Sequence, residues 1–339
     1  MSKNSTPLFW PTASFEMLHA RAAIVRRVRQ FFESRGFLEI ETPILSRDTV
    51  VDRHLEPFEV QVPGFTELFY LQTSPEFAMK RLLAAGATAI FQIGHVFRAG
   101  DRGKMHNPEF TMLEWYRVGD RYEQGIAFLS DLCDAILCRG AATVVTLRQL
   151  FAKHVGLHPH VAPCESFREF AFAGNLVFPE SFGVSENDRD DWIDFLFSEA
   201  IQPKLGRVEP VIVTDYPATQ SQLAKTRNVV EKQDVEEVGP GLSFSVAERF
   251  ELFVDGIELA NGYHELLDAE ILQQRILETN LLRVADGKKR LPESNRLLEA
   301  MRHGLPPCCG AALGLDRLIM AVLKASSIDD VIPFPQEIA

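Results

Sequence analysis

The stretch from Phe91 to Arg117 constrains the fold of this chain more than any other. An apolar run ends at Phe97, a polar loop containing glycine follows, and a second run of strand-like composition begins at Glu109. Two such runs around a loop predict a pair of antiparallel strands. The two runs also carry or adjoin polar side chains, namely Gln92, Arg98, Glu109, Glu114 and Tyr116. A strand that faces only an apolar core does not tolerate so many, so one face of this hairpin is expected to line a polar site.

The composition is that of a water-soluble globular protein. Of 339 residues, 46% are hydrophobic and 24% are charged, and no apolar run approaches the ~20 residues that span a bilayer. The N-terminus lacks the features of a signal peptide. A net charge of −12 repels phosphate backbones, so nucleic acid is not the expected partner. The five cysteines lack paired metal-ligand spacing, which favours free thiols in a reducing cytoplasm.

A helix over residues 14–35 and a strand over residues 37–45 are predicted ahead of the hairpin. The helix has apolar residues at spacings of three and four, with Ser14 as its N-cap and Gly36 just beyond its end. Pro43 cannot donate a ladder hydrogen bond, so the strand belongs at an edge or an interface. The pattern leaves open whether this helix and strand pack within one chain or form a dimer interface.

Helices and strands continue through the chain without the regular order of a doubly wound parallel sheet. The pattern predicts an α+β fold, in which a helical subdomain over residues 140–210 is inserted into a domain spanning residues 14–339. Asp255-Gly256 is a tight-hairpin signal, and residues 225–241 are predicted to form a surface loop. Further helices are expected at 77–85, 122–138, 147–155, 167–173, 189–200, 269–285, 296–303 and 316–324. Further strands are expected at 68–72, 211–215, 246–254, 257–265 and 310–315.

The common glycine-rich nucleotide loops and the nucleophile elbow are missing from the sequence. Glu251 and Glu258 flank the predicted turn and could oppose one another closely enough to bind one divalent cation, although paired strand carboxylates are more often only solvated. Arg317 begins the last helix, where the dipole disfavours a cation, so a dedicated anion partner is favoured. Glu76 is either an ordinary acid at a helix start or part of a site. Such arginines and carboxylates together suggest polyphosphate, a metal and a cationic substrate.

Three segments are similar to the signature motifs of class II aminoacyl-tRNA synthetases. Residues 36–43 resemble motif 1 with its proline, residues 97–111 resemble motif 2, and residues 314–317 resemble motif 3. The sequence is most similar to lysyl-tRNA synthetase in the segments TSPE at 73–76, HNPEFTMLEWY at 106–116 and ELANGYHEL at 258–266. The resemblance covers nearly the whole chain. It implies a class II synthetase-like antiparallel sheet flanked by helices, and a homodimer formed through the motif 1 helix and strand.

Two departures separate the chain from lysyl-tRNA synthetase. Motif 1 begins near residue 14, which leaves no room for an N-terminal anticodon-binding domain, and Ala312 stands where the synthetase typically has glycine. A methyl group at Ala312 would intrude on the amino-acid pocket, since glycine is used where a ligand approaches closely. Both features are similar to stand-alone relatives of the synthetase that activate (R)-β-lysine with ATP and transfer it to elongation factor P.

This resemblance implies ATP and Mg²⁺ as cofactors, a protein acceptor in place of tRNA, a cytoplasmic location and no membrane partner. Two alternatives stay open. One is a truncated enzyme that activates L-lysine for tRNA or another acceptor, and the other is a non-catalytic paralogue that binds lysine or ATP.

The resemblance also assigns roles to individual residues. The expected ATP site comprises Arg98, Ala99, Gly100, Asn107, Phe110, Glu258, Leu259, Gly314 and Arg317. The expected substrate site comprises Ser74, Pro75, Glu76, Glu114, Tyr116, Asn261, Glu265 and Ala312. Arg98 and Arg317 are expected to act in catalysis by holding the α- and γ-phosphates, and the expected Mg²⁺ ligands are Glu251 and Glu258.

Within these sites, Phe110 is expected to stack on adenine, and Glu76 with Ser74 to hold the amine near the reacting carboxylate. The distal ammonium is assigned to Glu114, Tyr116 and Glu265. Motif 2 usually reads Arg-x-Glu, but here Gly100 occupies the third position and Asp101 follows it. Either Asp101 substitutes for the glutamate, or adenine is held by backbone and stacking alone.

Overall fold

The computed structural model describes residues 9–179, 182–185, 188–231 and 242–339. The chain forms two compact units. The first contains Met1–Gly119, Ala135–Leu137 and Leu267–Ala339, and the second contains Asp120–Asp134 and Cys138–Leu266. Within the described residues, no helix combines the length and the apolar character needed to cross a bilayer.

The first unit is built on a sheet with the strand order β1-β5-β6-β12. β5 and β6 pair antiparallel from Ala89 opposite Arg117 to Phe97 opposite Glu109, which confirms the predicted hairpin. β12 runs antiparallel to β6 along its other edge, and β1 is parallel to β5. β6 therefore has a paired neighbour on each side. The strands are β1 (Leu38–Glu39), β5 (Ala89–Phe97), β6 (Glu109–Val118) and β12 (Cys308–Gly314).

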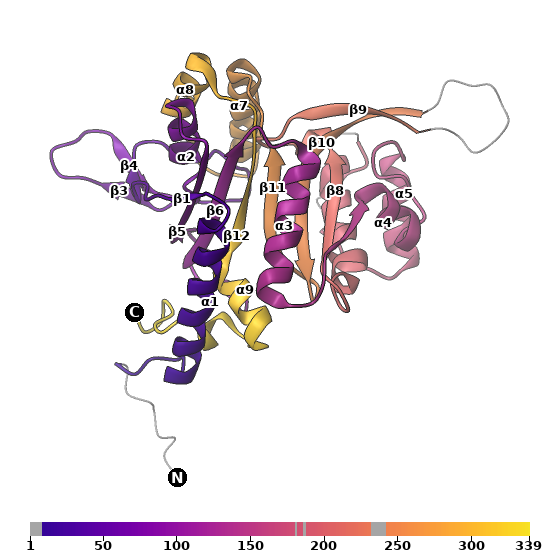
Figure 1. Ribbon diagram of the computed structural model, residues 1–339. Helices are drawn as coiled ribbons and strands as arrows, with labels where there is room; N and C mark the ends of the chain where they lie inside the picture. Colours follow the sequence, from indigo (N-terminus) through magenta and orange to yellow (C-terminus); the bar gives the residue numbers. More distant parts are fainter. Residues whose placement is uncertain (1–8, 180–181, 186–187, 232–241) are drawn as a thin grey trace, which may run out of the picture. The chain divides into compact units, whose positions relative to one another are not determined.

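Helices of the first unit begin within one residue of the predicted positions. The hydroxyl of Ser14 accepts a hydrogen bond from the backbone N–H of Met17 at 3.2 Å and so caps α1. Phe32 of α1 stacks on Phe91 of β5, with ring centroids 4.7 Å apart. α1 contacts α9, while α2, α7 and α8 lie side by side (Figure 1). The elements are α1 (Phe15–Glu33), α2 (Glu76–Ala84), α7 (Ala269–Ala285), α8 (Arg296–Gly304), α9 (Leu315–Leu323), and a small sheet of β2 (Leu45–Ser46), β4 (Leu68–Leu71) and β3 (Glu59–Gln61).

The second unit contains a sheet with the strand order β11-β10-β8-β7, and β9 also pairs with β10. The pairs are antiparallel except for β7 with β8. Asp255 and Gly256 both have positive φ and form the predicted turn between β10 and β11. The strands are β7 (Thr143–Thr146), β8 (Val211–Pro217), β9 (Thr226–Glu231), β10 (Leu242–Val254) and β11 (Ile257–His264).

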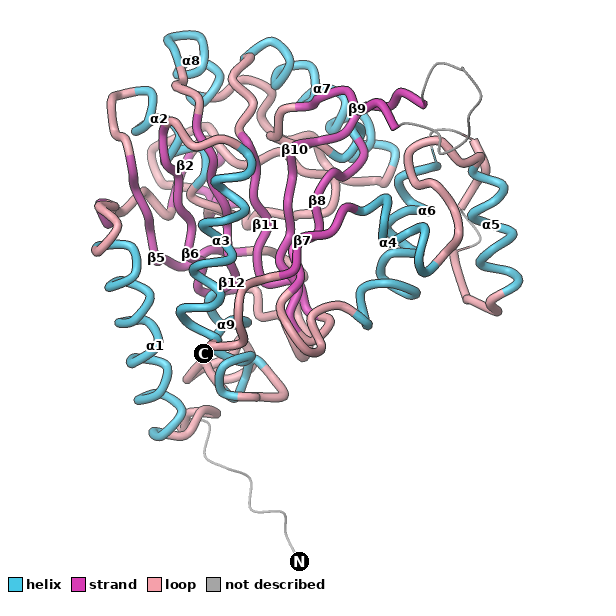
Figure 2. Tube along the Cα trace, turned by 45° about the vertical axis from the view of Figure 1, so that its right-hand side comes forward, coloured by secondary structure: helices cyan, strands magenta, loops and turns pink. Residues whose placement is uncertain are grey.

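Three helices of the second unit group together beside β7 and β8 (Figure 2). Trp192 and Phe167 from these helices share one hydrophobic core with Val213 of β8 and Phe253 of β10. The limits of an inserted subdomain at residues 140–210 stay a prediction. The helices are α4 (Leu147–His154), α5 (Cys164–Ala173) and α6 (Arg189–Leu196), and α3 (Tyr122–Leu137) precedes them in the chain.

Two predictions about elements are wrong. The single strand expected over residues 37–45 is replaced by β1 and β2, which belong to different sheets. Pro43 lies between them and lacks the N–H that a continuous ladder needs. Residues 226–231, expected to be part of a surface loop, form β9, in which exposed and partly buried positions alternate. The rest of that prediction, residues 232–241, lies outside the described residues.

The other predicted helices and strands are present, so the α+β prediction is confirmed. Cys138 is exposed, and the other four cysteines are buried.

Candidate active site

Glu114 lies at the centre of a buried polar cluster in the first unit. Its neighbours in register are Gln92 on β5 and Ala312 on β12. One carboxylate oxygen accepts a hydrogen bond from the hydroxyl of Ser74 at 2.7 Å, and the other accepts one from the hydroxyl of Tyr116, also at 2.7 Å. Glu114 and Tyr116 therefore share one face of β6, as their spacing of two predicts.

A second carboxylate, Glu76, enters this cluster from the first turn of α2. Pro75 occupies the N-cap position of this helix, and the backbone N–H of Glu76 donates to the Ser74 hydroxyl at 3.1 Å. The side-chain amine of Lys80 donates to Glu76 at 2.5 Å and lies 5.7 Å from the ring centroid of Tyr116. Lys80 is only 1% exposed, and our sequence analysis missed it. Its position four residues after Glu76 on one helix face was the available signal.

Burial raises the pKa of Glu114 to about 7, and the negative charge of Glu76 adds to this shift. The hydrogen bonds from Tyr116 and Ser74 and the positive charge of Lys80 act in the opposite direction. With Glu114 ionised, the cluster holds two carboxylates and one ammonium. A ligand ammonium would balance that charge, because buried charges are stable only when they are paired.

Gly310 makes room for Tyr116. The two residues are opposite one another in the β12–β6 pairing, and a Cβ atom at Gly310 would lie 2.3 Å from Cδ1 of the tyrosine ring. Glycine in a strand usually marks such a close approach. Ala312 and Gly314 on this strand were predicted as site residues, but Gly310 was not, because its role depends on the strand register.

Arg98 and Arg317 come together around the loop between β5 and β6. The Arg98 guanidinium lies 5.1 Å from the ring centroid of Phe110. Arg317, in the first turn of α9, donates to the Met105 carbonyl at 3.3 Å and contacts the His106 ring. Burial lowers the pKa of His106, and the charges of Arg317 and Arg98 lower it further, while Asp101 opposes them. Two cations, one at the start of this loop and one from α9 beside it, form a suitable place for a polyphosphate.

The rest of this loop has internal roles. Gly100 has φ +84°, a conformation that favours glycine, and the backbone N–H of Ala99 donates to the Glu56 carbonyl at 2.7 Å. The Asn107 side chain donates to the Glu109 carbonyl at 2.7 Å and accepts from the Gln336 N–H at 3.1 Å. Both ends of that amide are therefore used within the protein, and its contact with a nucleotide stays a prediction.

Gly314 is not required by its protein surroundings. The nearest atoms to a Cβ atom there belong to the Arg317 side chain, at an ordinary contact distance of 3.7 Å. The roles of Gly314 and of Asp101 toward a nucleotide stay predictions.

In the second unit, Glu251 and Glu258 do not oppose one another directly. Glu251 lies opposite Asn261, and Glu258 lies opposite Phe253. The two-residue turn alone pairs Glu258 with Phe253, and a bulge between Leu252 and Phe253 shifts the partner of Glu251 by one further residue. The expectation that the two glutamates oppose one another is therefore wrong, and their joint binding of one cation stays a prediction.

Glu251 is nonetheless held firmly within that unit. It accepts a hydrogen bond from the Tyr216 hydroxyl at 2.5 Å and is ion-paired with Arg249. Burial, followed by the charge of Glu251 and with a smaller contribution from Glu258, raises the pKa of Tyr216 well above its ordinary value. The negative charges of Glu251 and Glu258 therefore both raise the pKa of the Tyr216 hydroxyl.

Oxygen donors around Glu251 fit a hard cation such as Mg²⁺. Directly across the ladder, the buried side-chain amide oxygen (Oδ1) of Asn261 makes no hydrogen bond to any described residue. In the part of the chain that the structure describes, no three His, Cys, Asp or Glu side chains gather as a metal site. Mg²⁺ is commonly held by one or two carboxylates together with substrate phosphates, so two glutamates suffice. Leu259 and Glu265 are both buried in this unit, and their expected roles are untested.

Similar proteins match the chain over almost its whole length. The family model for class II tRNA synthetases (D, K and N) matches residues 10–338. A protein from Vibrio parahaemolyticus is 42% identical over 335 residues, which cover 97% of this chain and 98% of the relative. Relatives from Salmonella dublin and Hamiltonella defensa are 41% and 39% identical, covering 98% and 96% of this chain and 98% and 97% of their own lengths. All three relatives are named elongation factor P–(R)-β-lysine ligase.

Proposed function

Because the chain belongs to the family of class II tRNA synthetases (D, K and N), we propose that it activates (R)-β-lysine with ATP and transfers it to a lysine side chain of elongation factor P. The names of the relatives supply this substrate and this acceptor. One observation supports the proposal most strongly, namely the buried Glu114 carboxylate between Ser74 and Tyr116. Such a carboxylate suits a substrate that carries an ammonium group in addition to its reacting carboxyl group.

The amine-binding roles follow from the charge of the cluster. Lys80 already pairs with Glu76, so the charge of Glu114 is the one best supplied to a substrate ammonium. We assign the distal ammonium to Glu114 and Tyr116. Glu76 and Ser74 are assigned to the amine near the reacting carboxylate.

Activation needs charge neutralisation more than covalent participation by the protein. A carboxylate oxygen of the substrate forms a bond to the α-phosphorus of ATP, while the bond from that phosphorus to the bridging oxygen of pyrophosphate breaks. Arg98 and Arg317 would hold the phosphates and stabilise the charge that develops. Glu251 and Glu258 would hold Mg²⁺, which neutralises phosphate charge when it is bound.

In the transfer step, the nitrogen of the acceptor lysine attacks the carbonyl carbon of the adenylate. The bond from this carbon to the AMP oxygen breaks, AMP leaves, and the nitrogen loses a proton. The acceptor amine must be neutral to attack, and we assign no residue to the removal of its proton.

The proposal includes a homodimer in the cytoplasm. Apolar side chains in and near the motif 1 region support a partner surface, since Phe15 is 70% exposed and Leu38 is 63% exposed, and Ile44 is also exposed.

Activation can be tested by amino-acid-dependent exchange of pyrophosphate into ATP. We expect exchange with (R)-β-lysine to exceed exchange with L-lysine. Preference for L-lysine combined with charging of tRNA would identify a truncated synthetase instead. Absence of exchange with either amino acid would indicate a non-catalytic binding protein.

Ala312→Gly should increase the use of L-lysine relative to (R)-β-lysine by about tenfold, because one methyl group in a pocket changes discrimination by that order. Ala312 lies opposite Glu114 in register, so its methyl group shares a sheet face with the amine-binding carboxylate. Pyrophosphate exchange with each amino acid measures the ratio. Ala311→Gly is the matched control, because Ala311 is opposite Trp115 on the other face. An unchanged ratio in Ala312→Gly would remove this residue as the discriminator.

Affinity for the diamino acid should increase as the pH rises through about 7. Glu114 is largely protonated below this pH, and a neutral carboxyl group pairs poorly with an ammonium. Each pH unit below the midpoint should weaken binding by up to about tenfold. KM for the amino acid, measured on both sides of neutrality, gives the profile. Tyr116→Phe removes a hydrogen bond that stabilises the carboxylate, so the midpoint should move to higher pH; an unmoved midpoint would mean that another group titrates.

A further inference from the structure

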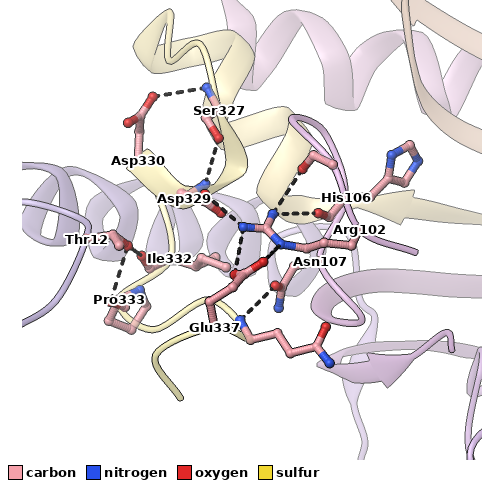
Figure 3. Close-up of polar contacts among 12 residues, drawn as sticks. Thr12, Arg102, His106, Asn107, Ser327, Asp329, Asp330, Ile332, Pro333 and Glu337 are labelled. Carbon is pink, nitrogen blue, oxygen red and sulfur yellow. Dashed lines mark hydrogen bonds and ion pairs between the residues drawn. The ribbon is translucent and has the colours of Figure 1, made fainter. Parts of the chain in front are cut away.

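The C-terminal segment over residues 327–337 packs against the loop that joins β5 and β6 (Figure 3). Two backbone contacts join them directly. The N–H of Ile328 donates to the Lys104 carbonyl at 2.8 Å, and the N–H of Gln336 donates to the Asn107 side chain at 3.1 Å. The segment therefore holds the loop at two points outside the predicted phosphate-binding arginines.

Between these points, the Arg102 side chain binds the side chains of Asp329 and Glu337; we call this set of contacts the clasp. Its guanidinium donates two hydrogen bonds to the Glu337 carboxylate, at 2.6 and 2.8 Å, and one to Asp329 at 3.0 Å. Its remaining terminal nitrogen donates to the carbonyls of Gly103 and His106, at 3.1 and 3.2 Å. One planar group thus ties two carboxylates of the C-terminal segment to two carbonyls of the loop, a geometry that lysine cannot reproduce.

The C-terminal segment is itself held in place by contacts with the rest of the unit. Thr12 donates through its backbone N–H to the Pro333 carbonyl at 2.9 Å and through its hydroxyl to the Ile332 carbonyl at 3.1 Å. Val331 between these contacts and Asp329 is fully buried. Ser327 and Asp330 cap the short turn that presents Asp329. These contacts fix the segment that carries both carboxylates.

The contacts of Arg102 connect to the two predicted phosphate-binding arginines, Arg98 and Arg317. Arg102 binds the carbonyl of His106, and the ring of the same histidine contacts Arg317. We propose that Arg102, held by Glu337 and Asp329, is a positioning residue that keeps the β5–β6 loop in the conformation in which Arg98 and Arg317 receive the phosphates of ATP. This inference rests on the proposed function for the ligand, but the clasp itself does not depend on it.

Limited trypsin digestion tests the clasp without any ligand. Glu337→Gln keeps the tryptic sites at Arg102 and Lys104, but it removes the negative charge from the ion pair between Glu337 and Arg102. Cleavage in this loop should become about threefold to tenfold faster, the range expected when an exposed but bidentate pair is lost. Glu270→Gln is the matched control, because Glu270 pairs with Arg302 on the exposed surface of the same unit. Equal loop cleavage in Glu337→Gln and the unmodified protein would overturn the clasp.

Direct binding of ATP, measured by calorimetry with Mg²⁺ present, tests the positioning role. Arg102→Ala should raise the Kd for ATP by about threefold to tenfold and leave KM for the amino acid unchanged, while Arg102→Lys should lie between it and the unmodified protein. An unchanged Kd in Arg102→Ala would overturn the positioning role even if the loop cleaves faster. If the unmodified protein binds no ATP, the proposed function and the positioning role both fail, and digestion still decides whether the clasp exists.

Discussion

Glu114→Gln should lower kcat/KM for (R)-β-lysine by at least about a hundredfold and leave ATP binding unchanged. The substitution keeps the size of the side chain and one oxygen that can accept from Ser74 or Tyr116, but it removes the charge assigned to the substrate ammonium. Leaving a buried charge without its partner costs ~3–5 kcal/mol, which corresponds to a factor of about a hundred or more. Pyrophosphate exchange at varied amino-acid concentration gives kcat/KM, and calorimetry gives the Kd for ATP.

Tyr116→Phe distinguishes the contribution of the Glu114 charge to kcat/KM from the contribution of the hydrogen bonds to Glu114. Only one hydrogen bond to Glu114 is lost, so the decrease in kcat/KM should be about tenfold or less. If Glu114→Gln retained more than about a tenth of the original value, Glu114 would not be the charge that the substrate ammonium meets.

Arg317→Ala should slow formation of the adenylate by about a hundredfold to a thousandfold, the range observed when one preorganised charge-stabilising donor is removed. Arg317 contacts His106 and the Met105 carbonyl, so the alanine variant also loosens the loop that carries Arg98. Single-turnover measurement of AMP or adenylate formation reports this step without the later transfer.

Arg317→Lys retains the positive charge but not the planar geometry, so its rate should lie between those of the alanine variant and the unmodified enzyme. Arg302→Ala, in an exposed pair with Glu270, should have no effect on the rate. A rate for Arg317→Ala close to that of Arg302→Ala would exclude Arg317 from activation.

Local patterns in the sequence predict most of the fold because they report burial periodicity and chain reversal. The hairpin from Ala89 to Val118 and the turn at Asp255-Gly256 follow from apolar runs and turn residues. β9 was missed because its polar residues look like those of a loop, whereas its order depends on pairing with β10. The strand expected over residues 37–45 was wrong because local composition does not reveal which sheet each end joins.

Within the candidate site, the period of two along β6 predicts that Glu114 and Tyr116 share a face. Residues whose roles depend on another segment were not predictable in this way. Gly310 matters because of its register with Tyr116, and Arg102 because the C-terminal segment returns to its loop. Glu251 and Glu258 are not cross-strand partners, because the two-residue turn at Asp255-Gly256 pairs Glu258 with Phe253.

The mass of intact elongation factor P, measured after incubation with this protein, ATP, Mg²⁺ and (R)-β-lysine, tests the central claim most directly. We predict an increase of one β-lysyl residue on one lysine side chain, with no increase when ATP is omitted or when Glu114→Gln replaces the unmodified enzyme. Unmodified elongation factor P, under conditions in which the same enzyme transfers lysine to tRNA, would contradict the account.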